Sequence, residues 1–269
     1  MKYTIFLLAI FALLIQSGCE TSNPTTPDDQ NNQGQPFSLV VARQQTAWGE
    51  VTIYAHDTLR AGYAELLVKV KYEGQYVQVS NLQFEPEMAM QGGMSHSTPI
   101  DTLFWDAQLQ GYQVHLVWVM ATYSPGGDKL GDWMVHLAGT VEQDTLDLTL
   151  PIEVYYAERV KAFISALDSA KVIAALHIPD PKVGLNDFDL FVYRKVMHRF
   201  EPVTDLSIEI EPEMPSMGHG SPNNQNPVHI RKGRYQGKVN FTMTGDWVIH
   251  TTFYRDSVHI GKVDFPVTF

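Results

Sequence analysis

The chain contains Gly131-Asp132-Trp133-Met134-Val135-His136 and, much later, Gly245-Asp246-Trp247-Val248-Ile249-His250. Alternate residues of a strand share a face, so one face of the first copy collects Trp133, Val135 and Leu137. The equivalent face of the second copy holds Trp247, Ile249 and Thr251. The two tryptophans are therefore predicted to fill the centres of two similar cores.

Another pair of segments repeats further upstream. Glu85-Pro86-Glu87-Met88 leads through a glycine-containing stretch to His96, and Glu211-Pro212-Glu213-Met214 leads in the same way to His219. Gly111-Tyr112-Gln113 likewise corresponds to Arg234-Tyr235-Gln236, with Met120 and Met243 following at the same spacing. We expect these two methionines to lie within strands and to pack in the core. An internal repeat of this length predicts two similar domains.

The repeat divides the folded part of the chain into residues 37–156 and 157–269. Each part has a common domain size and consists of runs of β-branched and aromatic residues between Gly, Pro, Asn and Asp. We therefore predict an all-β protein with two tandem immunoglobulin-like β-sandwich domains. Residues 157–176 have helical propensity, but their counterpart, residues 37–54, is β-rich. A hairpin turning near Asp168-Ser169 is expected there.

The N-terminus has the pattern of an export signal. Lys2 precedes an apolar run over residues 5–15, and Gln16-Ser17-Gly18-Cys19 follows. We interpret residues 1–18 as a signal peptide, because the run is short for a membrane span. Its end resembles a bacterial lipobox, which implies that Cys19 is the lipidated first residue of the mature protein. Gln16 departs from the aliphatic residue usual there, and the alternative is an incidental cysteine near an ordinary cleavage site.

Residues 19–36 are rich in Asn, Gln, Thr, Pro and Asp and have no aromatic residue. Such a segment cannot bury enough apolar surface to fold, so we expect a disordered tether. With a lipidated Cys19, the protein is expected in the cell envelope, anchored to the membrane through its N-terminal lipid and facing the periplasm or the cell exterior.

Charge and motifs exclude several functions. The formal net charge of −11 argues against binding to nucleic acid or to anionic lipid headgroups. Cys19 is the only cysteine, so no intramolecular disulfide is possible. The chain lacks the His-Glu-x-x-His, Cys-x-x-Cys, Gly-x-Ser-x-Gly and phosphate-loop patterns. We do not expect an enzyme.

The methionine-rich loops predict a metal site. Thioether and imidazole ligands together suit copper, above all Cu(I). In the second domain the candidate ligands are Met214, Met217 and His219. In the first domain the internal repeat proposes Met88, Met94 and His96. The alternative is that these methionines only fill the end of a core.

A resemblance to a known family supports the second domain. Residues 211–220, Gly233-Arg234-Tyr235, Met243 and Gly245-Asp246-Trp247 together resemble the YtkA-like domain. The first domain resembles it more weakly. The resemblance implies a small extracytoplasmic β-sandwich associated with copper-handling and oxidase-assembly proteins, with Met214, Met217 and His219 at the site. A partner protein that gives or receives the ion is expected.

Two alternatives remain open. His136 and His250 occupy equivalent strand positions, either as further metal ligands across the sheet or as exposed strand histidines. The whole chain can also be interpreted as a structural or protein-interaction module, in which tandem sandwiches present methionine loops to a partner. The position of the methionine sulfurs distinguishes these functions.

Overall fold

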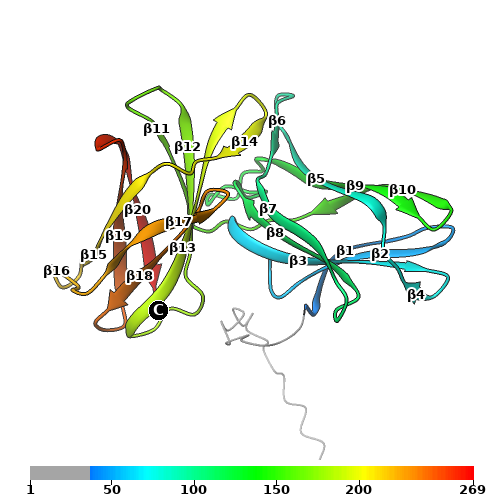
Figure 1. The fold of residues 1–269 in the computed structure, drawn as a ribbon, viewed down its shortest axis with the longest axis horizontal. Helices are drawn as coiled ribbons and strands as arrows, with labels where there is room; N and C mark the ends of the chain where they lie inside the picture. Colours follow the sequence, from blue (N-terminus) through cyan, green and yellow to red (C-terminus); the bar gives the residue numbers. More distant parts are fainter. Residues whose placement is uncertain (1–36) are drawn as a thin grey trace, which may run out of the picture. The chain divides into compact units, whose positions relative to one another are not determined.

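A computed structural model describes residues 37–269, and every regular element in this range is a β-strand. The strands form four antiparallel sheets, which make two tandem β-sandwiches (Figure 1). The predicted signal peptide, Cys19 and the tether lie outside the described residues. Within residues 37–269 no helix is long and apolar enough to cross a membrane.

The first sandwich consists of a six-stranded and a four-stranded sheet. The six-stranded sheet has the order β1-β2-β3-β8-β7, with β4 beside β3. Its strands are β1 (Leu39–Gln45), β2 (Gly49–Ala55), β3 (Gly62–Tyr72), β4 (Gln75–Tyr76), β7 (Ile100–Asp106) and β8 (Gly111–Trp118). The four-stranded sheet, in the order β10-β9-β5-β6, consists of β5 (Ser80–Met90), β6 (Ser95–Ser97), β9 (Gly131–Val141) and β10 (Asp144–Ile152).

The second sandwich repeats this topology strand for strand. Its six-stranded sheet has the order β11-β12-β13-β18-β17, with β14 beside β13. The strands are β11 (Val160–Ile164), β12 (Lys171–His177), β13 (Gly184–Val196), β14 (Arg199–Pro202), β17 (Gln225–Arg231) and β18 (Arg234–Phe241). The four-stranded sheet, in the order β16-β15-β19-β20, consists of β15 (Ser207–Met214), β16 (His219–Gly220), β19 (Asp246–Arg255) and β20 (Val258–Thr268).

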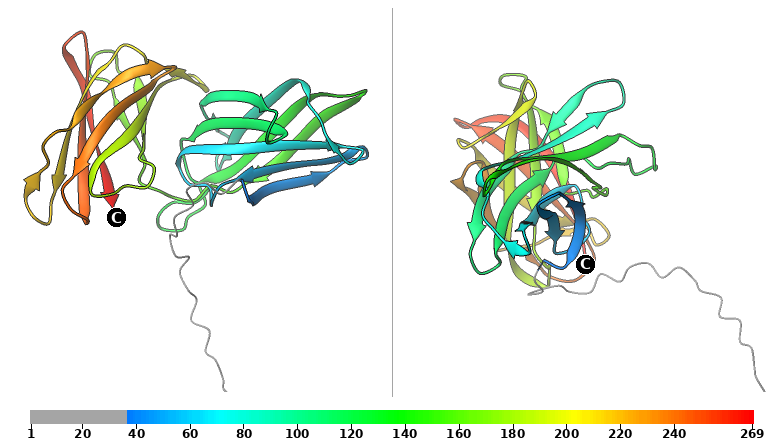
Figure 2. Two further views of the ribbon diagram at one scale, coloured as in Figure 1. Left: turned by 60° about the horizontal axis from the view of Figure 1, so that its bottom comes forward. Right: turned by 90° about the vertical axis from the view of Figure 1, so that its right-hand side faces the viewer.

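Both orders are those of immunoglobulin-like sandwiches, so the predicted fold class is confirmed. Figure 2 shows the two pairs of sheets from further directions, the first coloured blue to green and the second yellow-green to red. The predicted hairpin in residues 157–176 is also confirmed, because β11 and β12 pair antiparallel and Ser169 adopts a positive φ in the turn between them. Strand pairing therefore overrides the helical propensity of this segment.

The two tryptophans of the repeat occupy the predicted positions. Trp133 and Trp247 are each 1% exposed and lie in separate hydrophobic cores. Each indole Nε1 donates a hydrogen bond to a backbone carbonyl, that of Met120 at 3.0 Å and that of Met243 at 2.9 Å. The prediction that Met120 and Met243 lie within strands is wrong, because β8 ends at Trp118 and β18 at Phe241. Their carbonyls are free of the sheet ladder and can accept from the indole.

Side chains of the two sandwiches contact one another directly. Tyr63 of β3 stacks on Phe191 of β13, with ring centroids 4.8 Å apart and planes inclined by 8°. The Arg231 guanidinium lies 2.7 Å from the carboxylate of Asp101, whose side chain is fully buried. An apolar stack and a charge pair thus join residues that are far apart in the sequence.

Candidate metal centre

The Met/His loop of the second sandwich is a tight hairpin between β15 and β16. The amides of Met217 and Gly218 both donate to the Met214 carbonyl, at 3.1 and 2.9 Å. Gly218 has a φ of +63°, a conformation that favours glycine, and this allows the chain to reverse direction in a tight turn. Met214 and His219 then face each other as a cross-strand pair. Directly opposed side chains lie on the same face of a sheet, so the thioether and the imidazole share a face.

The two methionines of this loop have opposite environments. Met214 is only 4% exposed and belongs to the core of the second sandwich. Its terminal methyl group fills the space beside Gly245, where an added Cβ would lie 2.3 Å from Met214 Cε. Met217, at the turn, is 61% exposed. One thioether therefore closes the end of the core, and the other faces solvent.

His219 is held in one orientation. Its Nδ1 lies 2.9 Å from the Gly220 carbonyl oxygen, and its ring packs edge-on against Trp247, with centroids 5.7 Å apart. A carbonyl only accepts, so Nδ1 carries the proton and the Nε2 of the neutral ring keeps a lone pair. Protein imidazoles that ligate metals are commonly oriented by such a bond to the other nitrogen. Sequence reasoning placed Trp247 only in the core, although its motif lies in the same repeat as the loop.

The first sandwich contains the same cross-strand pair. Met88 of β5 pairs with His96 of β6. Met88 is fully buried, and its Cε would lie 2.9 Å from a Cβ added to Gly131. Met94, in the longer turn, is 62% exposed. Each sandwich therefore presents one buried methionine, one exposed methionine and one histidine at equivalent positions.

His96 differs from His219 in its partner. Its Nδ1 lies 3.1 Å from the Nζ of Lys195, which belongs to β13 in the second sandwich. The neighbouring Ser97 hydroxyl donates to the carbonyl of His198 at 2.6 Å. Partial burial, followed by the charges of Lys195, Lys171 and His198, lowers the pKa of His96. The imidazole is therefore neutral near pH 7 and is hydrogen-bonded to an ammonium group.

His136 and His250 do not join these loops. His250 Nε2 lies 2.9 Å from Glu213 and its Nδ1 2.7 Å from Asp264. Because Glu213 precedes Met214 in β15, its side chain lies on the opposite face of the sheet. His136 also lies between two carboxylates, 2.9 Å from Asp147 and 3.7 Å from Glu85, although Glu85 corresponds in the repeat to Glu211 and not to Glu213. Hydrogen bonding, chiefly to Asp264 and to Asp147 respectively, raises the pKa of each histidine.

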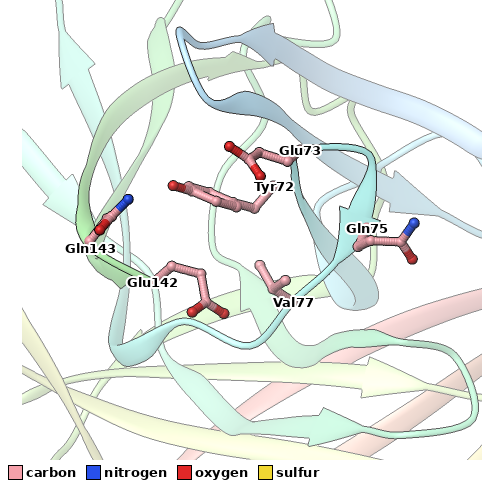
Figure 3. Close-up of a pocket in the computed structure, with 6 residues that line it drawn as sticks. All are labelled: Tyr72, Glu73, Gln75, Val77, Glu142 and Gln143. Atoms are coloured by element: carbon pink, nitrogen blue, oxygen red, sulfur yellow. The ribbon is translucent and has the colours of Figure 1, made fainter.

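A surface hollow in the first sandwich lies away from the Met/His loop. It is lined by Tyr72, Glu73, Gln75, Val77, Glu142 and Gln143 (Figure 3). Strands β5 and β9 run antiparallel, with Met90 opposite Gly131 at one end and Ser80 opposite Thr140 at the other. The loop follows Met90, whereas the hollow adjoins the Thr140 end, so the two lie at opposite ends of the sandwich.

Within residues 37–269, no three His, Cys, Asp or Glu side chains gather as a group that could hold a metal ion. The candidate loops are distinct from such groups in offering thioethers. Residues 168–252, from the β11–β12 turn into β19, match the family model described as YtkA-like. The second sandwich carries a YtkA-like domain. Its matched region includes Met214, Met217, His219 and Trp247. No curated protein matches the chain.

Proposed function

We propose that the YtkA-like domain binds Cu(I) through Met214, Met217 and His219 and holds or hands over the ion without covalent chemistry. One observation carries the proposal: His219 lies opposite Met214 on a hairpin whose turn presents Met217, and its Nε2 lone pair is free. Thioethers and a neutral imidazole are the soft donors that Cu(I) prefers. The donor set therefore fits this cargo.

The contrasting environments of the two thioethers suit transfer. Met214 is fixed by the core, whereas Met217 is exposed on a turn of only a few residues. A fixed sulfur and an oriented imidazole provide part of a site in advance, which lowers the ordering cost of binding. The exposed sulfur is the ligand that a partner protein reaches first.

The same proposal includes the location. A signal peptide and a lipidated Cys19 would place the sandwiches outside the cytoplasm, tethered by residues 19–36. Free thiol pairs tend to oxidise there, whereas a thioether has no proton to lose and forms no disulfide. Methionine ligands therefore suit Cu(I) in this compartment. We propose no enzymatic activity for the chain.

The test is a titration of residues 20–269 with Cu(I) against a chromophoric chelator under anaerobic conditions. Met217→Ala combined with His219→Ala removes two donors outside the core, and we expect affinity to fall at least tenfold. The matched control is Met94→Ala, because Met94 is equally exposed in the equivalent loop. A double variant that binds as tightly as the parent would contradict the site and favour an interaction module.

A further inference from the structure

The two Met/His loops have the same strand register but contrasting hydrogen bonds to their imidazoles. His219 is bonded to a backbone carbonyl of its own strand, and His96 to the ammonium of a lysine that is 99 residues away in the sequence. A carbonyl accepts and an ammonium donates. The two partners therefore select opposite tautomers of the neutral ring.

In the second sandwich the selected tautomer leaves one ring nitrogen of His219 able to bind a metal ion. Nδ1 of His219 donates to Gly220, so Nε2 keeps its lone pair. In the first sandwich Lys195 takes the Nδ1 lone pair of His96, and the proton of the neutral ring is then on Nε2. Neither nitrogen of His96 is left to bind a cation.

Lys195 belongs to a hairpin that is itself bonded to β6. It lies in β13, paired with Phe200 of β14, in the hairpin whose turn includes His198. The Ser97 hydroxyl of β6 donates to the His198 carbonyl at 2.6 Å. The strand that carries His96 is therefore bonded to the hairpin that carries Lys195 at two adjacent positions.

We propose that Lys195 blocks the Met/His loop of the first sandwich, so that the chain takes up one Cu(I) at the second sandwich and a second ion only when the Lys195–His96 bond is broken. The inference rests on the proposed function of the loops. It makes the contact between the sandwiches a control on metal capacity, since a partner that separates β6 from the β13–β14 hairpin would free the imidazole of His96 to act with Met94 and Met88.

The experiment measures Cu(I) stoichiometry by competition for residues 20–269 and three lysine variants. The parent is expected to bind one ion, and Lys195→Ala two. Lys195→Arg should still bind one, because a guanidinium also only donates. The control is Lys171→Ala, which removes another positive charge that acts on His96 without a hydrogen bond to it, and which should leave one ion. Lys195→Ala combined with His96→Ala should return the count to one.

A second measurement reports on the contact without metal. Long-range ¹H–¹⁵N spectra of histidine-labelled protein identify the protonated nitrogen of each neutral ring. We expect Nε2–H for His96 and Nδ1–H for His219 in the parent, and a changed His96 pattern in Lys195→Ala. Nδ1–H at His96 in the parent would overturn the block.

The stoichiometries separate the two proposals. One ion in both the parent and Lys195→Ala would overturn the block and leave the second-sandwich site intact. No ion in the parent but one in Lys195→Ala, lost again with His96→Ala, would overturn the second-sandwich site and support the block. No binding to any variant would overturn both.

Discussion

Gly245 and Met214 share one small volume at the end of the second sandwich. A Cβ on Gly245 would lie 2.3 Å from Met214 Cε, and the φ of Gly245 is +138°. In the first sandwich a Cβ on Gly131 would lie 2.5 Å from the Ala89 carbonyl oxygen. At both positions before the Asp-Trp pair, a side chain larger than glycine would clash with a neighbouring side chain or strand. The two sandwiches therefore share this packing arrangement as well as the loop.

Gly245→Ala is expected to lower the free energy of unfolding by about 1–3 kcal/mol, because the added methyl group overpacks Met214 and strains a positive φ. Chemical denaturation measures the change. Gly74→Ala is the control, since Gly74 also has a positive φ (+87°) but no neighbour within 4 Å. Equal losses in the two variants would show that the contact with Met214 costs nothing.

At the scale of the strands, His250 connects three elements of one sheet. It lies on β19 and is bonded to Glu213 on β15 and to Asp264 on β20. With both nitrogens facing carboxylates, the ring is best satisfied when it is protonated and donates twice. Its pKa is raised, first by the bond to Asp264, while Lys262 opposes the shift. The hydrogen bonds from His250 to both carboxylates therefore form only when the ring is protonated.

The stability contributed by His250 should fall as the pH rises. The pKa of His250 is higher in the folded protein than its ordinary value of 6.5. The stability that the protonated ring contributes is therefore fully present below pH 6.5. It is lost as the pH rises through the folded-state pKa. Because His250 and its two carboxylate partners are partly exposed, we expect this contribution to the free energy of unfolding to be less than about 1 kcal/mol. Unfolding free energies measured across this window for the parent and His250→Gln give the contribution as their difference. A difference that grows with pH would contradict the sign.

At the scale of the whole molecule, the Asp101–Arg231 ion pair between the sandwiches includes a fully buried carboxylate. Asp101 has no exposed side-chain surface, whereas Arg231 is 40% exposed. The Lys232 ammonium adds a hydrogen bond to the Asp101 backbone carbonyl at 3.3 Å. A buried carboxylate without its cation is costly, so this pair favours one arrangement of the two domains over separated ones.

Arg231→Ala should therefore cost about 3 kcal/mol, because it leaves a buried charge without its partner. Denaturant unfolding with domain-specific tryptophan fluorescence measures the loss and reveals whether the sandwiches unfold separately. Arg194→Ala is the control, since Arg194 pairs with Glu201 where both side chains are exposed, and such pairs contribute about 0–1 kcal/mol. A loss no larger than that of the control would contradict the buried-pair argument.

The sequence by itself determined the elements of both sandwiches. Alternation around Trp133 and Trp247 identified buried faces, and the repeat identified the equivalent hairpins, because periodicity and turn residues are local properties of the chain. The same local pattern wrongly placed Met120 and Met243 within strands, because β8 and β18 each end two residues earlier and the two carbonyls accept hydrogen bonds from the tryptophan indoles instead.

Only the tertiary structure decided how the candidate ligands differ. The two loops contain the same types of candidate ligand. In each loop one methionine is buried and the other is exposed, but His219 faces a carbonyl whereas His96 faces Lys195. Burial of one thioether depends on the space beside Gly245, and the state of His96 depends on a residue in the other sandwich. Such distinctions arise from packing between segments far apart in the chain, which no local pattern encodes.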